Sequence, residues 1–420
     1  MEFNRTKELK ELCAAIGNGR IKVVAGLRQI GKSYLLKNIL SRELIKNYNV
    51  KDEDICTIDL LVDYPNIRTS KKLENLINKV YKNNKFKYLF VDEVQLAEDG
   101  YAEVLIRFHL KNPDVEIFVT GSNSHALSND IICQFKEYCS SIVVNPLCYN
   151  EIIETISDFS VDDYIHYGGI PRVLEKTTVE DREYELRYLF NEIYFKDLVQ
   201  RNKFNYLSEQ SMQMILSHIF SSTNEICSIK IAKRISKKSG TNTENFLKLN
   251  KEVGDFIKWC NNAYLLIPFH NAIGTAIKAS NGVEGLHEKE YSIDNGLMNL
   301  NADALHLEEN LLENIVFLEL RQFNINIFGK TIIKTDNPSG ESNNGEIDFS
   351  FIYNEVEYNI QVAHTVTDSN REREIDNLLK TPKESKKLLI CKENLLEDID
   401  KSIYVYDIEY FIKNIREIIK

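Results

Sequence analysis

The chain contains 420 residues, of which 43% are hydrophobic, and it carries a formal net charge of −11. At about 150 residues per domain, this length allows roughly two to four domains, and the negative charge excludes a protein that binds polyanions over its whole surface. The eight cysteines form no C-x-x-C pair and show no metal-like spacing, no apolar run reaches the roughly 18 residues of a membrane span, and the N-terminus is charged. We therefore expect a reduced, cytoplasmic protein with no membrane segment.

A phosphate-binding loop follows the first predicted strand, IKVVA. The loop matches G-x-x-x-x-G-K-[ST] at every required position, and its residues are Gly26, Leu27, Arg28, Gln29, Ile30, Gly31, Lys32 and Ser33. The glycines allow backbone N–H groups to turn toward an anion at the N-terminus of the helix that begins near Tyr34. Lys32 supplies a charge for the β- and γ-phosphates, and Ser33 supplies a hydroxyl for magnesium. We predict that residues 26–34 bind ATP and Mg2+.

A second predicted strand ends in two carboxylates. Residues 87–91 form an apolar run that is typical of a buried parallel strand, and Asp92 and Glu93 follow it. Asp92 would hold Mg2+ directly or through water, and Glu93 would polarise the water that attacks the γ-phosphate. Glu93 therefore joins Lys32 in the candidate catalytic set, and Asp92 joins Ser33 as a candidate magnesium ligand.

A third apolar run covers residues 115–120 and is followed by polar residues. Because parallel strands open their carboxyl ends onto the same crevice, Ser122 or Asn123 is a candidate for a side chain that senses the γ-phosphate. A plain Ser or Asx turn is the alternative interpretation.

The order of these motifs resembles a family of bacterial and archaeal AAA-type ATPases. The similar segments run in the same order through nearly the whole chain and are GLRQIGKSYLL, LFVDEVQ, FVTGSNSHALS, NPLCYNEII, YIHYGGIPRVLE, IYFKDLVQRNK, YSIDNGLMN, LLENIVFLELRQ, GEIDFSFI, IQVAHT and REREIDNLL. The resemblance implies an ATP-binding core in which Lys32, Ser33, Asp92 and Glu93 have the roles given above. It also implies a winged helix and a C-terminal domain of uncharacterised activity.

The chain departs from the family at one position. A Gly-Arg dipeptide usually stands about eight residues before the Pro-Leu segment, whereas this chain has Glu137 and Tyr138 there. If that arginine stabilises charge in the transition state, its loss costs a factor of about 10³ to 10⁵ in rate, as in other phosphoryl transferases. Arg172, Arg201 or Lys136 could replace it, and ATP binding is expected more firmly than turnover.

Residues 159–205 read as a small helical lid around the sequence Gly-Gly-Ile-Pro at 168–171, where the glycines permit a sharp turn. A packing elbow without ligand contact is the alternative. The helical and strand-like patterns of residues 206–280 suit a winged helix-turn-helix.

Residues 228–251 form a basic stretch within this region. They contain seven basic residues against Glu244 alone, a local charge of +6. The stretch could contact DNA phosphates, with Thr241, Asn242 and Thr243 opening the helix that enters a groove. A solvated helix face or a protein contact is the alternative interpretation.

The C-terminal domain, predicted over residues 281–420, resembles the restriction-endonuclease-like fold. Glu313 lies on a long predicted helix, and a predicted turn at 354–355 pairs two strands so that Asp348 faces Gln361. The Glu-x-Lys triplet that completes a metal site in that fold is Gln361-Val362-Ala363 here. A neutral amide is a weak magnesium ligand and alanine cannot activate water, so we expect a retained fold with lost chemistry. His364 is expected to be a structural histidine, and Lys380 and Lys383 lie too far along the chain to replace the lysine.

The predicted architecture is therefore α/β: a P-loop AAA-type ATPase core with a parallel sheet over residues 1–158, the lid, the winged helix and the nuclease-like domain. The favoured function is an ATPase that couples Mg-ATP binding and hydrolysis to movement of the later domains, with DNA as a candidate partner. A nucleotide-gated, metal-dependent nuclease using Glu313 and Asp348 is one alternative. A nucleotide switch that hardly hydrolyses ATP and binds a protein partner or a second copy is the other.

Overall fold

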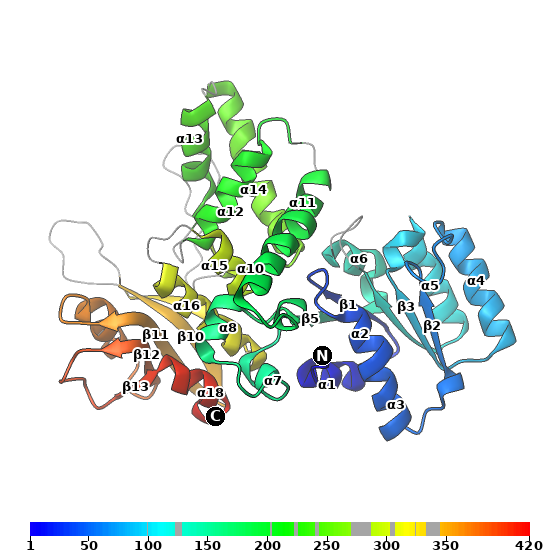
Figure 1. Ribbon diagram of the computed structural model, residues 1–420, viewed down its shortest axis with the longest axis horizontal. Helices are drawn as coiled ribbons and strands as arrows, with labels where there is room; N and C mark the ends of the chain where they lie inside the picture. The colour runs from blue at the N-terminus through cyan, green and yellow to red at the C-terminus, as the bar shows by residue number, and fades with distance from the viewer. Residues whose placement is uncertain are drawn as a thin grey trace.

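The computed structural model describes residues 1–98, 100–121, 128–201, 204–221, 226–239, 243–269, 287–302, 307–323, 325–332 and 345–420. Figure 1 shows an elongated molecule with a sheet at each end and helices between them. The N-terminal helix α1 (Thr6–Ala15) lies between the first sheet and the central helices.

The first sheet has five strands, all parallel, in the order β2-β3-β4-β1-β5. The strands are β1 (Ile21–Gly26), β2 (Ile55–Asp59), β3 (Tyr88–Asp92), β4 (Glu116–Thr120) and β5 (Cys139–Val144). All residues of β1 and β3 are buried, which explains their continuous apolar sequences. The predicted α/β fold class with a parallel P-loop sheet is confirmed.

Helices cover both faces of this sheet. The loop after β1 runs into a continuous helix made of α2 (Lys32–Tyr34), the π-helical η1 (Leu35–Leu40) and α3 (Ser41–Asn47); the other helices are α4 (Ser70–Asn83), α5 (Tyr101–Lys111) and α6 (Ser128–Phe135). In α4 the apolar positions Leu73 and Ile77 face inward, and the Thr69 hydroxyl caps the first turn. The carboxyl ends of β1, β3 and β4 consequently meet at one edge beside the N-terminus of α2.

Short helices connect the first sheet to the rest of the chain. They are α7 (Tyr149–Ile153), α8 (Val161–Tyr167), α9 (Pro171–Leu174), α10 (Val179–Tyr188), the π-helix η5 (Leu189–Phe195) and α11 (Lys196–Arg201). The sharp turn predicted at the two glycines is present: Gly168 has φ +69°, and Pro171 starts α9 as its first residue. A β-carbon at Gly168 would collide with the carboxylate of Asp294, so the turn requires glycine.

A helical unit with a small antiparallel sheet follows. Its elements are α12 (Glu209–Phe220), β6 (Ile226–Cys227), α13 (Ser228–Ser239), α14 (Thr243–Asn262), β7 (Leu266–Phe269) and β8 (His287–Ser292), with strand order β6-β8-β7. The sheet therefore extends past residue 280, where the sequence placed a boundary. Helix α15 (Asn295–Asn301) leads out of it.

The second five-stranded sheet is mixed, with the order β13-β12-β11-β10-β9. Its elements are α16 (Leu307–Leu320), β9 (Phe328–Ile332), β10 (Gly345–Tyr353), β11 (Val356–Val366), η7 (Glu372–Asp376), α17 (Asn377–Leu379), β12 (Lys386–Asn394), β13 (Ile403–Asp407) and α18 (Ile408–Ile418). The predicted hairpin is present, because Tyr353 pairs with Val356 and both residues of the turn have positive φ.

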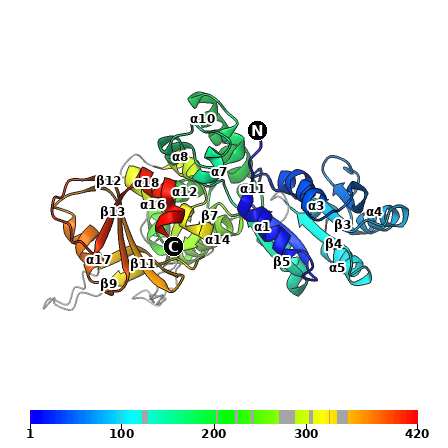
Figure 2. The same cartoon turned by 90° about the horizontal axis from the view of Figure 1, so that it is seen from below.

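One apolar cluster runs through the molecule. It includes Val24 and Phe118 on one face of the first sheet, Leu189 in the central helices and Phe349 in the second sheet. A separate cluster fills the other face of the first sheet, and a third fills the far face of the second sheet. The parts seen side by side in Figure 2 thus share a continuous core.

Candidate functional site

The phosphate-binding loop has the backbone shape that its glycines predict. Gly26, Gln29 and Gly31 have φ values of +134°, +62° and +98°. A β-carbon on Gly26 would collide with the carbonyl oxygen of Val144 in β5, and Gly31 is the residue that immediately precedes α2. The loop can therefore keep this conformation only with glycine at position 26.

Lys32 is buried within the loop that it is expected to serve. Its ammonium donates to the carbonyl oxygens of Leu27 at 2.8 Å and Gly26 at 3.1 Å. Burial lowers the pKa of Lys32 to about 8, although Glu93 and Asp92 act in the opposite direction. Carbonyl oxygens are weaker partners for an ammonium than phosphate oxygens are.

Ser33 and Asp92 lie side by side at the carboxyl edge of the sheet. The Ser33 hydroxyl donates to Asp92 Oδ1 at 2.8 Å, and the Thr120 hydroxyl at the end of β4 donates to the same oxygen. A hydroxyl and a carboxylate are oxygen ligands of the kind that Mg2+ prefers. The residues present thus fit a magnesium ion beside a bound triphosphate, and Thr120 belongs to this group although nothing in the sequence pattern indicated it.

Two further residues of this edge were missed. The Lys37 ammonium, one turn beyond Ser33, bridges Asp92 Oδ2 at 2.5 Å and the carboxylate of Asp59, which ends β2. Burial alone would lower the pKa of Lys37, but its hydrogen bonds to Asp59 and Asp92 outweigh that effect and raise it. The sequence did contain signals for both residues. The run ICTID ends in an acid, Asp59, as LFVD ends in Asp92, and Lys37 follows Ser33 by four residues, which places both on one helix face.

Glu93 occupies an unusual backbone position directly after β3. Its φ and ψ are +56° and +45°, its N–H donates to Thr120 Oγ1 at 3.3 Å, and its carboxylate accepts from the side-chain amide of Gln95. Left-handed backbone at a non-glycine residue is uncommon and often marks a functional position. Ser122 and Asn123 lie outside the described residues.

The central helices contact the tip of the phosphate-binding loop. The guanidinium of Arg28 forms an ion pair with Asp197 of α11 at 3.0 Å, and the Tyr194 hydroxyl donates to the Arg28 carbonyl at 3.1 Å. Arg172 of α9 donates to the side-chain oxygen of Gln29. Three residues were candidates to replace the family arginine, and of these Arg172 lies against the loop. Lys136 is in the short helix η4 (Lys136–Tyr138), and the side chain of Arg201 is outside the described part.

The N-terminus also holds this loop. Arg5, which precedes α1, is buried and donates to the Ile30 carbonyl at 2.7 Å and to the carbonyl of Asn145 after β5. It therefore ties the loop to the segment that leaves the first sheet.

The predicted basic stretch covers α13 and the start of α14. Its apolar residues Ile231, Ala232 and Ile235 are buried, whereas its basic side chains are exposed where described. The exposed residues are Lys230, Lys233, Arg234, Lys237, Lys248 and Lys251. Thr241 and Asn242 lie outside the described residues.

The acids considered for a nuclease site meet a buried lysine. Lys289 of β8 forms an ion pair with Glu313 of α16 at 2.5 Å, and the Tyr291 hydroxyl donates to the same carboxylate at 2.5 Å. Asp348 accepts from the backbone N–H of Val362 at 2.8 Å, and burial together with Glu313 raises its pKa well above the usual range. The sequence pattern gave no reason to place a lysine from the preceding sheet here.

The other candidate residues of this region have the following surroundings. Gln361 is buried with an unpartnered side-chain oxygen, His364 pairs with Glu308 at 2.7 Å, and Lys380 and Lys383 are exposed. Across the described ranges, no three His, Cys, Asp or Glu side chains are grouped as a metal ion would require.

Residues 18–153 match the family model of the AAA domain. This match supports an AAA-type P-loop ATPase. Along its whole length the chain is similar to an uncharacterised protein of Methanocaldococcus jannaschii, with 26% identity over 98% of this chain and 86% of that protein. An uncharacterised protein of Haemophilus influenzae is 24% identical over 98% of this chain and 99% of its own. A DNA polymerase III gamma subunit-related protein of Thermotoga maritima aligns with 60% of this chain and 99% of its own at 14% identity, with a TM-score of only 0.27.

The AAA-type segment, residues 18–153, contains the phosphate-binding loop and the ends of β2 and β3 with Asp59 and Asp92. It ends at residue 153 in α7, so the helices that contact the loop tip come from outside it. Within the described residues no helix is both long and apolar enough to cross a membrane.

Proposed function

We propose that this protein binds Mg-ATP at the edge formed by residues 26–34, Asp92 and Glu93 and hydrolyses it. The observation that carries the proposal is the 2.8 Å contact between Ser33 and Asp92, which joins the loop to the acid at the end of β3. Bound magnesium would neutralise charge on the phosphates. Lys32 then exchanges its loop carbonyls for phosphate oxygens, and Glu93 orients the attacking water and accepts its proton.

The position of Lys37 makes a specific demand on this site. Its ammonium occupies Asp92 Oδ2 while Ser33 and Thr120 use Oδ1. A divalent cation at Ser33 therefore competes with Lys37 for the charge of Asp92, and Asp59 remains as the partner that holds the lysine nearby.

Nucleotide binding is tested with Lys32→Ala. We expect at least a tenfold loss of affinity for a fluorescent ATP analogue, because a buried ammonium that pairs with phosphate is removed. Lys71→Ala, an exposed lysine on α4, is the matched control. Unchanged affinity in a folded Lys32→Ala protein would contradict the proposal.

Turnover is tested separately with Glu93→Gln. This variant should bind ATP normally and release phosphate at least a hundredfold more slowly, since a general base contributes about 10² to 10⁴. Equal phosphate release by the two proteins would remove Glu93 from the mechanism. If the wild-type chain releases no phosphate at all while still binding ATP, the nucleotide-switch alternative is favoured.

We propose that residues 159–205 act as a lid that contacts the phosphate-binding loop at Arg28 and Gln29 and responds to the nucleotide bound there. Arg172 is our candidate in this lid for approaching a phosphate, because its guanidinium contacts Gln29 while it also pairs with Glu185 of α10 at 2.5 Å. Arg172→Lys should keep part of the activity and Arg172→Ala should lose it, with nucleotide affinity changed less than the rate. Arg187→Ala, an exposed arginine on α10, is the control.

A second function, DNA contact, is favoured by the exposed basic side chains of α13 and α14. We propose that the unit from α12 to β8 is a winged helix that binds duplex phosphates through them. Replacing Lys233 and Arg234 with Gln should weaken binding of a fluorescent duplex equally for unrelated sequences and reduce its salt dependence. Lys82→Gln and Lys111→Gln are the control, and binding unaffected by the α13 changes would point to a protein partner.

For the C-terminal region we propose a structural role. The ammonium of Lys289 already balances the charge of Glu313, as a metal ion would otherwise do. Plasmid and single-stranded DNA incubated with Mg2+ or Mn2+ should stay intact. Cleavage that Asp348→Ala abolishes would instead support the nuclease alternative.

A further inference from the structure

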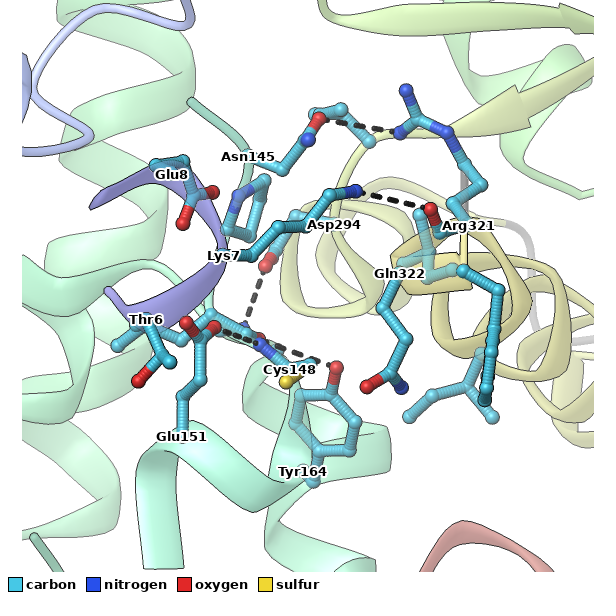
Figure 3. A pocket seen from close by; sticks show the side chains of 18 of the residues that line it. Thr6, Lys7, Glu8, Asn145, Cys148, Glu151, Tyr164, Asp294, Arg321 and Gln322 are labelled. Carbon is cyan, nitrogen blue, oxygen red and sulfur yellow. Dashed lines mark hydrogen bonds between the residues drawn. The ribbon is translucent and has the colours of Figure 1, made fainter. Parts of the chain in front are cut away.

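A cavity of about 510 Å³ lies where the separate parts of the chain meet. Its walls come from α1, the segment after β5, the turn at 168–169, the segment after β8, and the helices α16 and α18. Figure 3 shows its polar side chains. None of residues 26–34 lines it, so this cavity is separate from the proposed nucleotide site.

Two cations in its wall donate hydrogen bonds to neutral oxygens. The Lys7 ammonium donates to the backbone carbonyl of Arg321 at 3.1 Å, and the Arg321 guanidinium donates to the side-chain oxygen of Asn145 at 3.3 Å. Among the described residues neither cation has a carboxylate within 4.0 Å. Within the described ranges, the direct hydrogen-bond acceptors of these two cations are therefore neutral oxygens.

Both cations are partly buried and so lose part of their hydration. Burial lowers the pKa of Arg321 to about 10, and burial lowers the pKa of Lys7, against which Glu11 and Glu8 act only partly. A partly desolvated cation whose hydrogen-bond acceptors are neutral oxygens is less stable than one paired directly with an anion. An anion between these groups would stabilise both.

The cavity also contains acceptors without donors. The Oε2 atom of Glu8, the Oε1 atom of Glu151 and the side-chain oxygen of Gln322 are buried and have no hydrogen-bond partner within the described structure. Glu8 and Glu151 are only 3% and 7% exposed. In Figure 3 these glutamates lie on one side of the cavity and Arg321 on the other. Polar groups buried in this way normally have partners, so they indicate donors on an absent molecule.

We propose that this cavity binds a small organic anion whose phosphate or carboxylate group lies between Lys7 and Arg321 and whose hydroxyl or amino groups face Glu8 and Glu151. The volume is within the range of about 300–1,000 Å³ that is usual for small-molecule sites. Because the cavity is lined by both the N-terminal helix α1 and the C-terminal helices α16 and α18, a bound ligand would contact both ends of the chain.

The site is tested by thermal shift and calorimetry on the full chain with the Lys32→Ala change, which weakens anion binding at the phosphate loop. The probes are citrate, glucose 6-phosphate and O-phosphoserine, which combine an anionic group with donors, and glucose is the neutral control. At least one anionic probe should raise the melting temperature and show saturable heat, whereas glucose should do neither. No response to any of the three overturns the proposal.

The variants assign any response to this cavity. Arg321→Met and Lys7→Met should each weaken the responding probe at least tenfold, Arg321→Lys should keep part of the affinity, and Arg20→Met, which changes an exposed arginine, should have no effect. If the response survives both Met variants, the ligand binds elsewhere and the proposal fails. Because these experiments use protein that lacks Lys32, their outcome does not depend on ATP hydrolysis.

Discussion

Replacing Glu319 with glutamine should change how stability depends on pH. Glu319 lies on α16 and is completely buried. Its Oε1 atom accepts from the Tyr149 N–H of α7 at 3.0 Å and from the Tyr164 hydroxyl of α8 at 2.7 Å, and its Oε2 atom accepts from Gln322 at 2.7 Å. One carboxylate therefore joins the AAA-type segment, the helices that follow it and the C-terminal region.

Burial raises the pKa of Glu319 from 4.5 to about 7, despite the opposing hydrogen bonds from Tyr149 and Tyr164. The folded chain thus holds this proton more tightly than the unfolded chain does. The resulting stabilisation is complete below pH 4.5 and is lost as the pH rises through about 7. At about 1.4 kcal/mol for each pH unit, the loss is roughly 3 kcal/mol.

The assay is urea denaturation of wild-type and Glu319→Gln protein between pH 4.5 and 7.5. Glutamine is neutral throughout and keeps an oxygen for the two donors, while the Gln322 amide can turn its free oxygen toward the new NH2 group. The free energy of unfolding of the variant should gain about 3 kcal/mol on wild type across this range. Asp294, whose pKa burial raises to about 6, titrates in both proteins and cancels in the difference. Parallel pH profiles would refute the reasoning.

Two other changes test the site edge and the glycine turn. Lys37→Met removes the cation that Asp59 and Asp92 share, so the melting temperature should fall in EDTA. Adding MgCl2 should raise the melting temperature of the variant more than that of wild type. An equal rise in the two proteins would argue against a shared cation position. Gly168→Ala should lower the melting temperature by many degrees, because its β-carbon meets the Asp294 carboxylate at φ +69°. Gly254→Ala on α14, where a β-carbon meets nothing, should be neutral or stabilising.

Local sequence determined much of the AAA-type segment and the hairpin. Continuous apolar runs predicted buried strands ending at Asp92 and near residue 120, and the motif at 26–33 predicted the loop between β1 and its helix. The alternation of polar and apolar residues on both sides of 354–355 predicted the pairing of β10 with β11 through a two-residue turn. These features depend on side-chain periodicity and on backbone preferences within a few residues, which a sequence carries directly.

Only the tertiary structure brought distant polar residues together. The bridge from Lys37 to Asp59, the ion pair of Lys289 with Glu313 and the cavity around Lys7 and Arg321 each join elements far apart along the chain. The first two contacts depend on strand order. Strand β2 lies beside β3, and β8 pairs with β6 and β7 although it lies beyond the domain boundary that the sequence predicted. Periodicity says that a residue is polar or buried but not which partner it meets, because that partner is chosen by how sheets and helices pack.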